Sequence, residues 1–360
     1  MRKIVTIIPT LEIGGAESLV ISLLTNYNHK KEKIILIMLF NKDKNLYEDI
    51  LSKYPIEIIY MNKRNGADLS LFFSLYKILN KIQPDIIHTH LYSSSYVLPW
   101  KVFHNNVFWY HTVHSVAEKE LYSFHIKLMK IAYYFNLAQP VAISDLIKKS
   151  IIDFYNVSEN RVKTIYNGIN LENYKVDKKQ YFFNDKINLV SVGRLTTVKN
   201  HMMLLRVLKK INNNKFSLTI VGGGDQKNIL NKYIIDNNLG DMVKMVGETN
   251  NVVNYLKLAD IFVLTSIYEG LPISIIEAMA AGLPIVSSDV GGVSDIVKNE
   301  VNGFLFNKDD DEALEKILIN YLNNKSLIEN QGIYNKKDCQ KYDIKIIAKK
   351  YEDLFLNYDK

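Results

Sequence analysis

Apolar segments of strand length alternate with helical patterns along this chain, and they form two separate series. The first series lies near residues 3–8, 34–40, 56–60, 85–88, 107–113 and 140–143, and the second near 187–192, 217–222, 243–246, 261–264 and 284–288. Strands that alternate with helices are typical of a parallel, doubly wound sheet. Because there are two series, the sequence predicts an α/β protein with two such sheets and therefore two domains.

The polar stretch between the two series is interpreted as a linker. Residues 170–185 are rich in Lys and Asn, and they separate the two sets of strand candidates. The 360 residues are long for one core and suit two domains. A last helix is expected near residues 344–358, where apolar side chains recur at helical spacing.

One strand–helix–strand segment carries two carboxylates eight positions apart. The run 261–264 predicts a buried strand, Pro272 suits the first turn of a helix, and the helix is expected to end at Gly282 before a second strand. In such a unit the strand's carboxyl end and the helix's amino end face one crevice, where free N–H groups and the helix dipole attract a phosphate. Glu269 is expected at the rim of this crevice, and Glu277 about one and a half turns into the helix.

Carboxylates are poor ligands for phosphate, so the natural partners of Glu269 and Glu277 are hydroxyl groups, such as those of a ribose and a hexose. A nucleotide sugar carries both. Two cations extend the pattern, because Arg194 follows a strand candidate and Lys199 lies five residues later in a Thr-rich loop. A guanidinium and an ammonium stabilise a departing nucleoside diphosphate by charge-assisted hydrogen bonds. The alternatives are an ordinary pair of surface cations and, for Glu277, a solvated helix carboxylate.

Two glycine-rich turns follow predicted strands. Residues 222–225 read Gly-Gly-Gly-Asp, with Gly223 in the middle, and Gly14 and Gly15 precede a predicted helix. Each turn either lets the backbone approach a nucleotide or needs glycine for a positive φ. The sequence leaves both interpretations open.

Four histidines, His88, His90, His111 and His114, lie at predicted strand ends of the first domain. We interpret His88 and His111 as buried, hydrogen-bonded side chains. A metal site built from several of these histidines is an alternative. No carboxylate or cysteine cluster lies near them in the sequence, so no metal is expected.

The spacing of Glu269 and Glu277 resembles the paired-glutamate signature of glycosyltransferase family 4, whose members are retaining enzymes with the GT-B fold. Other segments resemble family motifs in the same order along the chain. In the first domain, Gly14-Gly15-Ala16-Glu17 resembles the glycine loop, residues 84–90 resemble the third-strand ending, 111–115 the acceptor-side histidine segment, and 142–144 the strand and serine that follow. Residues 166–169 resemble the hinge, Gly193-Arg194 with Lys199-Asn200 resembles the diphosphate clamp, and 281–284 with Gly291-Gly292 resemble the closing segments of the donor domain. No single segment is decisive, whereas their joint order, from about residue 3 to residue 306, is highly specific.

The resemblance implies two Rossmann-like, doubly wound domains that face a central cleft. Residues 1–170 are expected to bind the acceptor, together with a C-terminal helix at 341–360 that crosses back, and residues 171–340 to bind the donor. The implied catalytic residues are His114, Arg194, Lys199 and Glu269, and the implied nucleotide-sugar-binding residues are Gly14, Gly15, Gly223, Gly270, Leu271 and Glu277. Within this set, Glu277 is expected to bind the ribose hydroxyls, Glu269 the transferred sugar, and His114 the donor sugar.

The implied function is retaining, metal-independent transfer of a hexose from a nucleotide diphosphate sugar, with a UDP-sugar favoured. The acceptor is expected to be a saccharide, and the resemblance implies that a lipid carries it, as in the assembly of capsule, exopolysaccharide or lipopolysaccharide. Retention without an evident enzymic nucleophile suggests that the leaving diphosphate accepts the proton of the attacking hydroxyl. Three alternatives stay open: a nucleotide-sugar 2-epimerase, a sugar phosphorylase or sucrose-type synthase of the same fold, and a catalytically silent partner subunit of a glycosyltransferase.

Charge indicates an anionic partner, because the formal net charge is +7. Nucleic acid is least favoured, since the lysines are dispersed and no recognition motif accompanies them. Residues 118–136 place apolar side chains at helical spacing with Lys119, Lys127 and Lys130, which suits either a helix in a lipid interface or a helix that buries one face. The single cysteine, Cys339, fits a reducing compartment, and no apolar run is long enough to span a bilayer. We expect a cytoplasmic protein that is peripheral at the inner face of the cell membrane.

Overall fold

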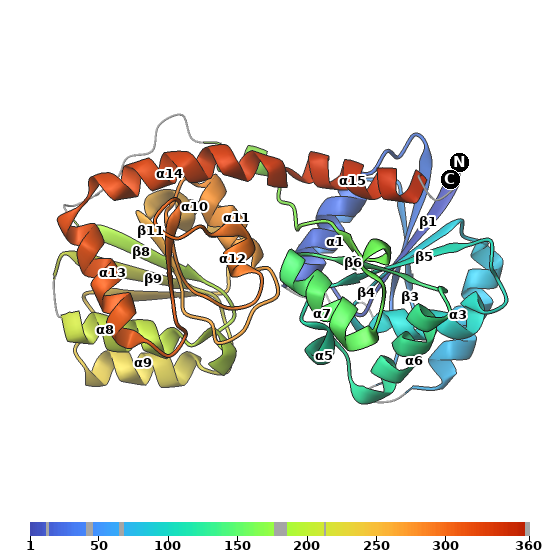
Figure 1. Ribbon diagram of the computed structural model, residues 1–360, viewed down its shortest axis with the longest axis horizontal. Helices are drawn as coiled ribbons and strands as arrows, with labels where there is room; N and C mark the ends of the chain where they lie inside the picture. Colours follow the sequence, from blue (N-terminus) through green and yellow to red (C-terminus); the bar gives the residue numbers. More distant parts are fainter. Residues whose placement is uncertain (12–13, 41–45, 65–67, 176–185, 212–213, 357–360) are drawn as a thin grey trace. The chain divides into compact units, whose positions relative to one another are not determined.

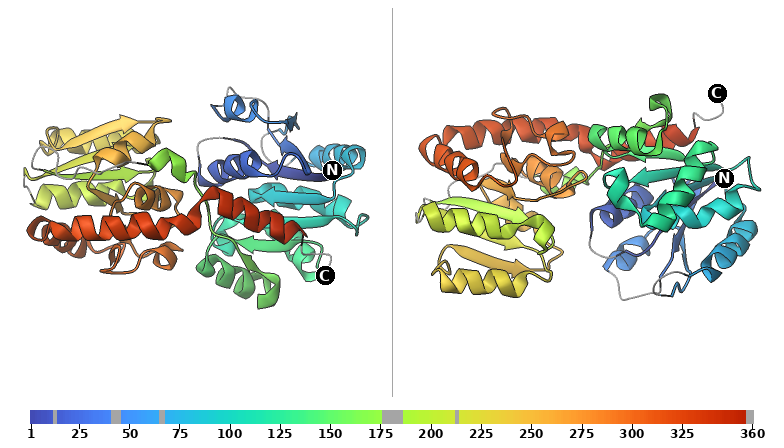
Figure 2. Two further views of the ribbon diagram at one scale, coloured as in Figure 1. Left: turned by 90° about the horizontal axis from the view of Figure 1, so that it is seen from above. Right: turned by 60° about the horizontal axis from the view of Figure 1, so that its bottom comes forward.

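The computed structural model describes residues 1–11, 14–40, 46–64, 68–175, 186–211 and 214–356. The chain divides into two compact units: unit 1 comprises Met1–Gly168 and Ile344–Lys360, and unit 2 comprises Ile169–Asp343. Each unit contains one parallel β-sheet with helices on both of its faces (Figure 1). Figure 2 shows the same layers from two further directions. The predicted α/β class with two doubly wound sheets is therefore confirmed.

Within the described residues, the sheet of unit 1 has seven strands in the order β3-β2-β1-β4-β5-β6-β7. They are β1 (Arg2–Ile8), β2 (Glu32–Met38), β3 (Ile56–Tyr60), β4 (Ile86–His90), β5 (Phe108–Val113), β6 (Gln139–Ala142) and β7 (Lys163–Thr164). β1 lies between β2 and β4, and it pairs Ile4 with Ile34 on one side and with Ile86 on the other. The six predicted strands are present, whereas β7 was not predicted because two residues carry no recognisable pattern.

The helices of unit 1 connect successive strands, except for α15, which is the last element of the chain described. They are α1 (Gly15–Asn26), α2 (Leu46–Leu51), α3 (Ser70–Ile82), α4 (Leu98–Lys101), α5 (Ala117–Glu120), α6 (Ser123–Tyr134), α7 (Asp145–Tyr155) and α15 (Ile344–Leu356), with the 3-10 turns η1 (Leu91–Val97) and η2 (Glu159–Arg161). α7 shows how the sequence sets such an element. The Ser144 hydroxyl accepts a hydrogen bond from the Ile147 N–H, and Asn156, which follows the last helical residue, has a φ of 52°.

The last helix, α15, belongs to unit 1 although it follows unit 2 in the sequence. The Tyr110 hydroxyl donates to the Leu354 carbonyl at 3.1 Å, and the Arg2 guanidinium donates to the Phe355 carbonyl at 3.1 Å. The Tyr351 hydroxyl lies 3.1 Å from the Thr112 hydroxyl of β5. The predicted last helix is thus present, and the end of its predicted range, beyond residue 356, lies outside the described residues.

The described part of unit 2 contains a six-stranded parallel sheet in the order β10-β9-β8-β11-β12-β13. Its strands are β8 (Ile187–Val192), β9 (Phe216–Val221), β10 (Val243–Gly247), β11 (Ile261–Leu264), β12 (Ile285–Ser288) and β13 (Gly303–Phe306). The five predicted strands are present, and β13 was missed. A Cβ atom at Gly303 would lie 1.9 Å from the Ile285 carbonyl oxygen, so this strand begins with a glycine, which in a sequence indicates a turn.

Polar side chains fix the register between β8 and β11 at their amino ends. The buried Asp260 carboxylate accepts from the Asn188 N–H at 2.7 Å and from the Asn188 side-chain amide at 2.8 Å. Asn188 in turn accepts from the Ser217 hydroxyl at the start of β9 at 2.7 Å. Three strands that are far apart in the sequence are therefore joined by one polar network.

The helices of unit 2 lie on both sides of this sheet. They are α8 (His201–Ile211), α9 (Lys227–Asp236), α10 (Val252–Leu258), α11 (Ile273–Ala280), α12 (Val293–Ile296), α13 (Asp311–Asn323) and α14 (Ser326–Asp338), with the 3-10 turns η3 (Leu171–Tyr174), η5 (Thr197–Lys199) and η6 (Cys339–Tyr342). η3 occupies the start of the predicted linker, and the rest of that linker, 176–185, lies outside the described residues.

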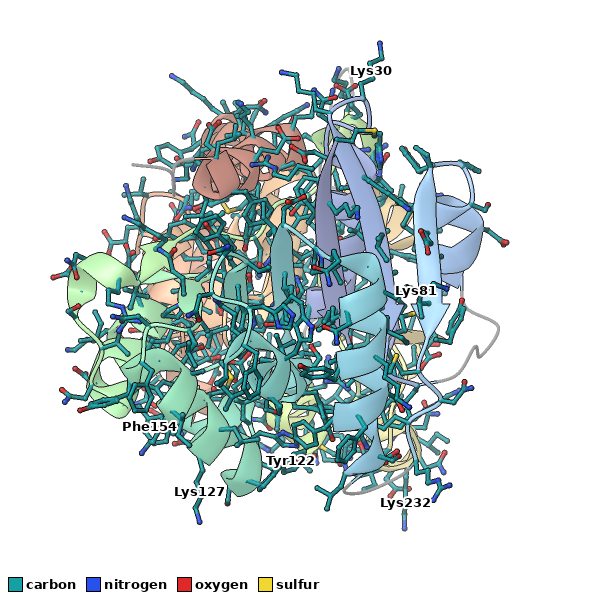
Figure 3. The ribbon with its side chains drawn as sticks, turned by 90° about the vertical axis from the view of Figure 1, so that its right-hand side faces the viewer. Lys30, Lys81, Tyr122, Lys127, Phe154 and Lys232 are labelled. Carbon is teal, nitrogen blue, oxygen red and sulfur yellow. The ribbon has the colours of Figure 1, made fainter. Side chains whose placement is uncertain are left out.

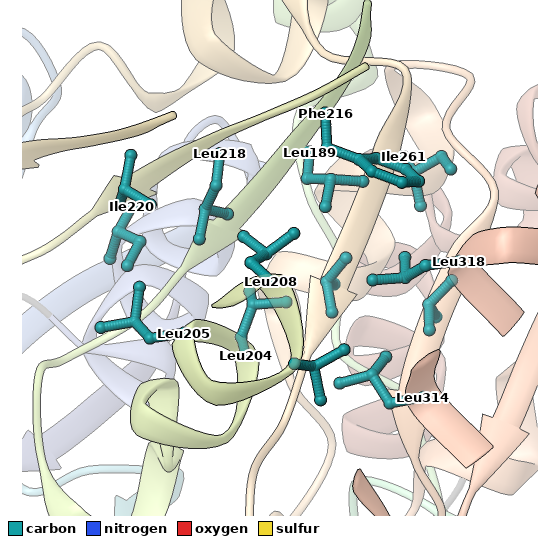
Figure 4. Close-up of a cluster of buried hydrophobic side chains, with 14 of the residues drawn as sticks. Leu189, Leu204, Leu205, Leu208, Phe216, Leu218, Ile220, Ile261, Leu314 and Leu318 are labelled. Atoms are coloured by element: carbon teal, nitrogen blue, oxygen red, sulfur yellow. The ribbon is translucent and has the colours of Figure 1, made fainter. Parts of the chain in front are cut away.

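Leucines of α8 form the centre of a buried apolar cluster in unit 2. Leu204, Leu205 and Leu208 face the strand residues Leu189, Phe216, Leu218, Ile220 and Ile261, and Leu314 and Leu318 of α13 close the cluster from the side (Figure 4). Each of these side chains is almost completely buried. Burial of this kind is the main favourable term for folding, so the cluster holds the helix layer on the sheet.

We predict that Leu208→Ala lowers the free energy of unfolding of unit 2 by about 2–5 kcal/mol, because it removes buried methyl groups and leaves a cavity. Leu258→Ala is the matched control, since Leu258 is 70% exposed and its loss should cost about 0.5 kcal/mol or less. Urea unfolding should be followed by far-UV circular dichroism, because both tryptophans, Trp100 and Trp109, lie in unit 1. Equal losses in the two variants would contradict this account of the core.

Candidate active site

The loops that follow β8 and β11 lie side by side at the carboxyl edge of the unit 2 sheet. β8 and β11 are neighbours in the sheet, and the strand order reverses between them. Ligands of open α/β sheets bind at such a reversal, outside the carboxyl ends of the strands. The Ile267 N–H donates to the Val198 carbonyl at 2.7 Å, and the Thr265 hydroxyl donates to the carbonyls of Lys199 and Asn200 at 3.1 and 2.9 Å. The two loops are therefore held together by hydrogen bonds.

An ion pair joins two of the predicted catalytic residues across these loops. The Lys199 ammonium lies 2.5 Å from Glu269 Oε1, and the Ser266 hydroxyl donates to the same oxygen at 2.6 Å. The Lys199 side chain is 21% exposed and the Glu269 side chain 9%. Glu269 is thus more buried than the rim position expected from the sequence. The sequence also did not indicate that Lys199 would be the partner of Glu269.

A turn at Gly291 and Gly292 packs against the backbone of Glu269 and Gly270. The Gly292 N–H donates to the Gly270 carbonyl at 2.7 Å. Gly291 has a φ of +60°, and a Cβ atom there would lie 1.9 Å from the Glu269 carbonyl oxygen. Only glycine fits this position without moving the segment. Gly270 and Leu271 then lead to α11, whose first-turn N–H groups have no acceptor within the helix.

Arg194 and the glycine run lie beside this arrangement. Arg194 follows β8 and is exposed. Gly222 has a φ of +143° and passes so close to the Gly193 carbonyl that a Cβ atom would lie 2.0 Å from its oxygen. The requirement for positive φ therefore explains Gly222 on structural grounds. Gly223 needs no positive φ, but a Cβ atom there would lie 2.4 Å from Glu248 Oε1, and its contact with a nucleotide stays a prediction.

Glu277 lies on α11 and is held by a tyrosine that the sequence did not single out. The Tyr174 hydroxyl donates to Glu277 Oε1 at 2.9 Å. Glu277 is half-buried and Tyr174 is buried. Burial raises the pKa of Glu277, and the hydrogen bond from Tyr174 opposes that rise. The sequence distance of 103 residues explains why no local pattern could indicate this pair.

Four histidines of unit 1, His88, His90, His111 and His114, are packed together at the ends of β4 and β5. His90 Nδ1 lies 2.9 Å from His114 Nε2, so one of these nitrogens carries a proton and donates a hydrogen bond to the other. His88 Nε2 lies 2.8 Å from the Thr112 hydroxyl, and His111 Nδ1 lies 3.1 Å from the Thr89 carbonyl oxygen. His88 and His111 are buried, as predicted. Within the described residues, no group of three His, Cys, Asp or Glu side chains is arranged to hold a metal ion.

Burial keeps these imidazoles neutral near pH 7. It lowers the pKa of His88 and of His114 to about 3, and that of His111 to about 4. Burial, with neighbouring histidines, also holds the pKa of His90 well below its usual value. His114 can therefore offer a hydrogen bond to a neutral hydroxyl, but it does not carry a positive charge for a phosphate.

The glycine loop of unit 1 lies at the start of α1. Gly14 has an extended φ of −165° and precedes the helix, and its carbonyl accepts from the Ser18 N–H at 3.0 Å. A Cβ atom at Gly14 would lie 2.3 Å from Glu17 Oε2, so the Glu17 side chain covers this glycine. Gly15 is the first residue of the helix. Gly14 has no positive φ, and a Cβ atom there would meet only the end of the flexible Glu17 side chain, so neither feature requires glycine at this position.

Comparison with known proteins follows the same division of the chain. The family model "Glycosyltransferase Family 4" matches residues 13–173, and the model "Glycosyl transferases group 1" matches residues 173–338. The Escherichia coli protein UDP-Gal:alpha-D-GlcNAc-diphosphoundecaprenol alpha-1,3-galactosyltransferase is 29% identical over 336 residues, which cover 86% of this chain and 85% of that protein. The chain belongs to glycosyltransferase family 4.

One further relative and one solved structure cover nearly the whole chain of this family 4 glycosyltransferase. The capsular polysaccharide biosynthesis glycosyltransferase CapH of Staphylococcus aureus is 25% identical over 370 residues, 99% of each chain. The crystal structure of Anabaena Alr3699/HepE in complex with UDP and glucose has a TM-score of 0.83, with 19% identity over 99% of this chain and 100% of that one. The two-sheet architecture is therefore the GT-B fold.

A buried carboxyl that the sequence did not indicate lies behind the histidine segment of the glycosyltransferase. Glu120, at the end of α5, accepts from the His114 N–H at 2.9 Å, and its Oε1 lies 3.9 Å from His111 Nε2. The Thr89 carbonyl can only accept, so the proton of His111 is on Nδ1. Burial raises the pKa of Glu120 to about 8. The two side chains are within ion-pair distance, but burial favours the neutral form of each, so they form a neutral pair near pH 7.

The helix expected over residues 118–136 is divided, which corrects the sequence prediction. α5 ends at Glu120 and α6 begins at Ser123, with Leu121 in an extended conformation between them. The Glu120 carboxyl turns inward to the His114 N–H, and Leu121 is buried. Both contacts require the chain to leave the helical path, which explains the break.

α6 buries one face and exposes the other. Met129, Ala132 and Tyr133 are buried against unit 1. The exposed side chains, here called the α6 outer face, are Tyr122, Phe124, Lys127, Lys130, Ile131, Tyr134 and Phe135. Lys127 projects away from the helix (Figure 3), and the Lys130 ammonium lies 4.7 Å from the centre of the Phe154 ring. No helix within the described residues is both long and apolar enough to cross a membrane.

We predict that Glu120→Gln changes the pH dependence of stability. The pKa of Glu120 is about 8 in the folded protein and about 4.3 in an unfolded chain, so its favourable contribution is complete below about pH 4 and is lost as the pH rises toward 8. Relative to the variant, the wild-type protein should therefore lose stability between pH 5 and pH 8. Urea unfolding followed by tryptophan fluorescence reports on unit 1 and measures this difference.

Glu118→Gln is the control for this experiment, because Glu118 lies on the same short helix and is exposed. Its stability should change with pH in parallel with the wild-type protein. If Glu120→Gln also runs parallel to wild type over this range, the raised pKa of Glu120 is wrong.

Proposed function

We propose that this glycosyltransferase transfers a hexose, with retention, from a nucleotide diphosphate sugar to a saccharide acceptor. The observation that carries the proposal is the Lys199–Glu269 ion pair at the strand reversal of unit 2. It puts an ammonium beside the amino end of α11, where a diphosphate is stabilised. Unit 2 is proposed to bind the donor, and unit 1 to bind the acceptor.

A UDP-sugar is the favoured donor. The E. coli relative is named for UDP-Gal, and the Anabaena structure of the same fold is a complex with UDP and glucose. In our proposal Glu277 binds the ribose hydroxyls, Glu269 the hexose, and Gly223, Gly270 and Leu271 supply close backbone contacts. His114, Gly14 and Gly15 of unit 1 are proposed to contribute to the same reaction.

The proposed chemistry needs positioning and charge stabilisation more than a general base. The acceptor hydroxyl attacks the anomeric carbon from the side on which the diphosphate leaves, so the configuration is retained. As the bond from that carbon to the phosphate oxygen breaks, the diphosphate gains negative charge and accepts the hydroxyl proton. Lys199 and Arg194 stabilise this charge. Glu269 holds the Lys199 ammonium in place through their ion pair.

The acceptor is proposed to be a lipid-linked saccharide of cell-surface polysaccharide assembly. The E. coli relative is named for an acceptor on diphosphoundecaprenol, and the S. aureus relative for capsular polysaccharide biosynthesis. The test is a transfer assay with UDP-, GDP- and ADP-sugars and short lipid-linked acceptors, with the product analysed by NMR. An α-linked product from an α-linked donor supports retention. Epimerised nucleotide sugar formed without an acceptor would instead identify a 2-epimerase.

We predict that Arg194→Ala and Lys199→Ala each reduce kcat by about 10²–10³-fold, because each removes one preorganised donor to the developing charge. Steady-state kinetics of the folded variants with donor and acceptor measures the loss. Lys232→Ala is the control, since Lys232 is an exposed lysine of α9 and should leave turnover unchanged. Full turnover in either site variant would remove that residue from the proposed diphosphate site.

The α6 outer face is proposed to lie against an anionic membrane surface. It combines exposed aromatic and aliphatic side chains with Lys127 and Lys130, and Lys119 is exposed on α5 nearby. Aromatic side chains suit the lipid interface, and lysines are attracted to anionic lipid head groups. This placement would keep unit 1 next to a membrane-bound acceptor at the cytoplasmic face.

We predict that the protein sediments with liposomes that contain anionic lipid and much less with neutral ones. Binding should weaken as salt rises, because the Debye length falls from about 10 Å at 0.1 M to about 3 Å at 1 M. Replacing Lys119, Lys127 and Lys130 by Glu should release the protein while preserving transfer to a soluble acceptor.

The control for this experiment carries the same change of charge on unit 2, with Lys209, Lys232 and Lys244 replaced by Glu; all three are exposed. Only the α6 variant should lose liposome binding. If both triple variants lose it equally, net charge rather than this face is responsible, and if the parent protein never binds, the membrane proposal fails.

A further inference from the structure

Tyr174 is the side chain that holds Glu277 in place. It lies at the end of η3, whose first turn is capped by the Asn170 side chain, which accepts from the Glu172 N–H at 3.1 Å. η3 packs against α10 and α11, and Leu171 and Tyr174 are buried there. The tyrosine ring is therefore fixed by packing before its hydroxyl meets the carboxylate.

The direction of this hydrogen bond follows from the chemistry of the two groups. Burial and the nearby Glu277 carboxylate raise the pKa of Tyr174, so its hydroxyl stays protonated and donates. Glu277 Oε1 accepts at 2.9 Å. No group among the described residues donates to Glu277 Oε2, so the tyrosine occupies one oxygen and leaves the other to accept from a ligand.

We propose that Tyr174 is a positioning residue for nucleotide binding: it fixes the Glu277 carboxylate so that its second oxygen meets a ribose hydroxyl. This inference rests on the proposed role of Glu277 in the donor site. A half-buried carboxylate without a donor turns toward water or takes up a proton, and either change weakens its hydrogen bond to a hydroxyl. The Tyr174 hydroxyl prevents both changes without touching the nucleotide itself.

The test compares Tyr174→Phe with wild type by calorimetry, using UDP and 2′,3′-dideoxy-UDP, or the GDP or ADP pair if wild type binds those nucleotides instead. We expect Tyr174→Phe to bind the ribonucleotide about tenfold more weakly. The variant removes the hydrogen bond that fixes Glu277, and the Glu277 carboxylate then makes a weaker hydrogen bond to the ribose hydroxyl. The affinity for the dideoxynucleotide should stay within about twofold of wild type. A purely structural role for Tyr174 would weaken both nucleotides equally.

Tyr321→Phe is the matched control. The buried Tyr321 hydroxyl of unit 2 donates to Gln331 Oε1 at 2.5 Å, so this variant also loses a buried tyrosine hydrogen bond. It should lower the stability of unit 2 and leave the affinity for both nucleotides unchanged. A similar loss of nucleotide affinity in Tyr321→Phe would mean that lower stability, and not positioning, explains the effect.

Glu277→Gln tests the proposed role of Glu277 separately from that of Tyr174. If Glu277 binds the ribose, this variant loses the preference for ribonucleotide over dideoxynucleotide, and adding Tyr174→Phe to it has no further effect on that preference. If Glu277→Gln keeps the preference, the proposed role of Glu277 fails. If Glu277→Gln loses the preference but Tyr174→Phe keeps it, the role of Glu277 stands and the inference about Tyr174 is wrong.

Discussion

The parallel pairing of β8 with β11 is the constraint on which the active-site geometry of unit 2 depends. The two strands are far apart in the sequence, since β8 ends at Val192 and β11 begins at Ile261. Asp260 fixes their register at the amino ends through the Asn188 backbone and side chain. Because strands are stiff, a register fixed at one end also sets which residues face each other at the other end. There, Lys199 and Glu269 meet at 2.5 Å.

The two units handle charge in opposite ways. Unit 2 keeps charged groups near its strand ends and pairs them, as Lys199 does with Glu269. Unit 1 places four histidines at the corresponding edge of its sheet, where burial favours the neutral rings. A site for a diphosphate needs fixed charges, whereas a site for sugar hydroxyls works with neutral donors and acceptors. This contrast agrees with the proposed division into donor and acceptor units.

Strand positions and the Glu269–Glu277 segment could be predicted from the sequence because their signals are local. Apolar runs, Pro272 and Gly282 are read within a few residues of the elements that they define. The partners of the site residues could not be predicted in this way. Lys199 and Glu269 are 70 residues apart, and Tyr174 and Glu277 are 103 apart, so each pair exists only after the sheet is assembled.

The division between α5 and α6 shows a second limit of sequence reasoning. Helical spacing continued through Leu121, yet the inward turn of the Glu120 carboxyl toward the His114 N–H ended the first helix. A backbone donor at the end of a neighbouring strand decided the local conformation. β13 was missed for a comparable reason, because Gly303 is required by the close approach of β12 and not by a turn.

The position of α15 in the sequence has a consequence for the order in which the two units can fold during synthesis. β1 leaves the ribosome long before α15, because the Phe355 carbonyl that accepts from Arg2 is made 353 residues later. All of unit 2 is synthesised in between. Until α15 is synthesised, the surface of the first unit that α15 covers is exposed to water. This surface includes the hydroxyls of Tyr110 and Thr112. Unit 2, whose residues are continuous in the sequence, can complete its own fold before the first unit does.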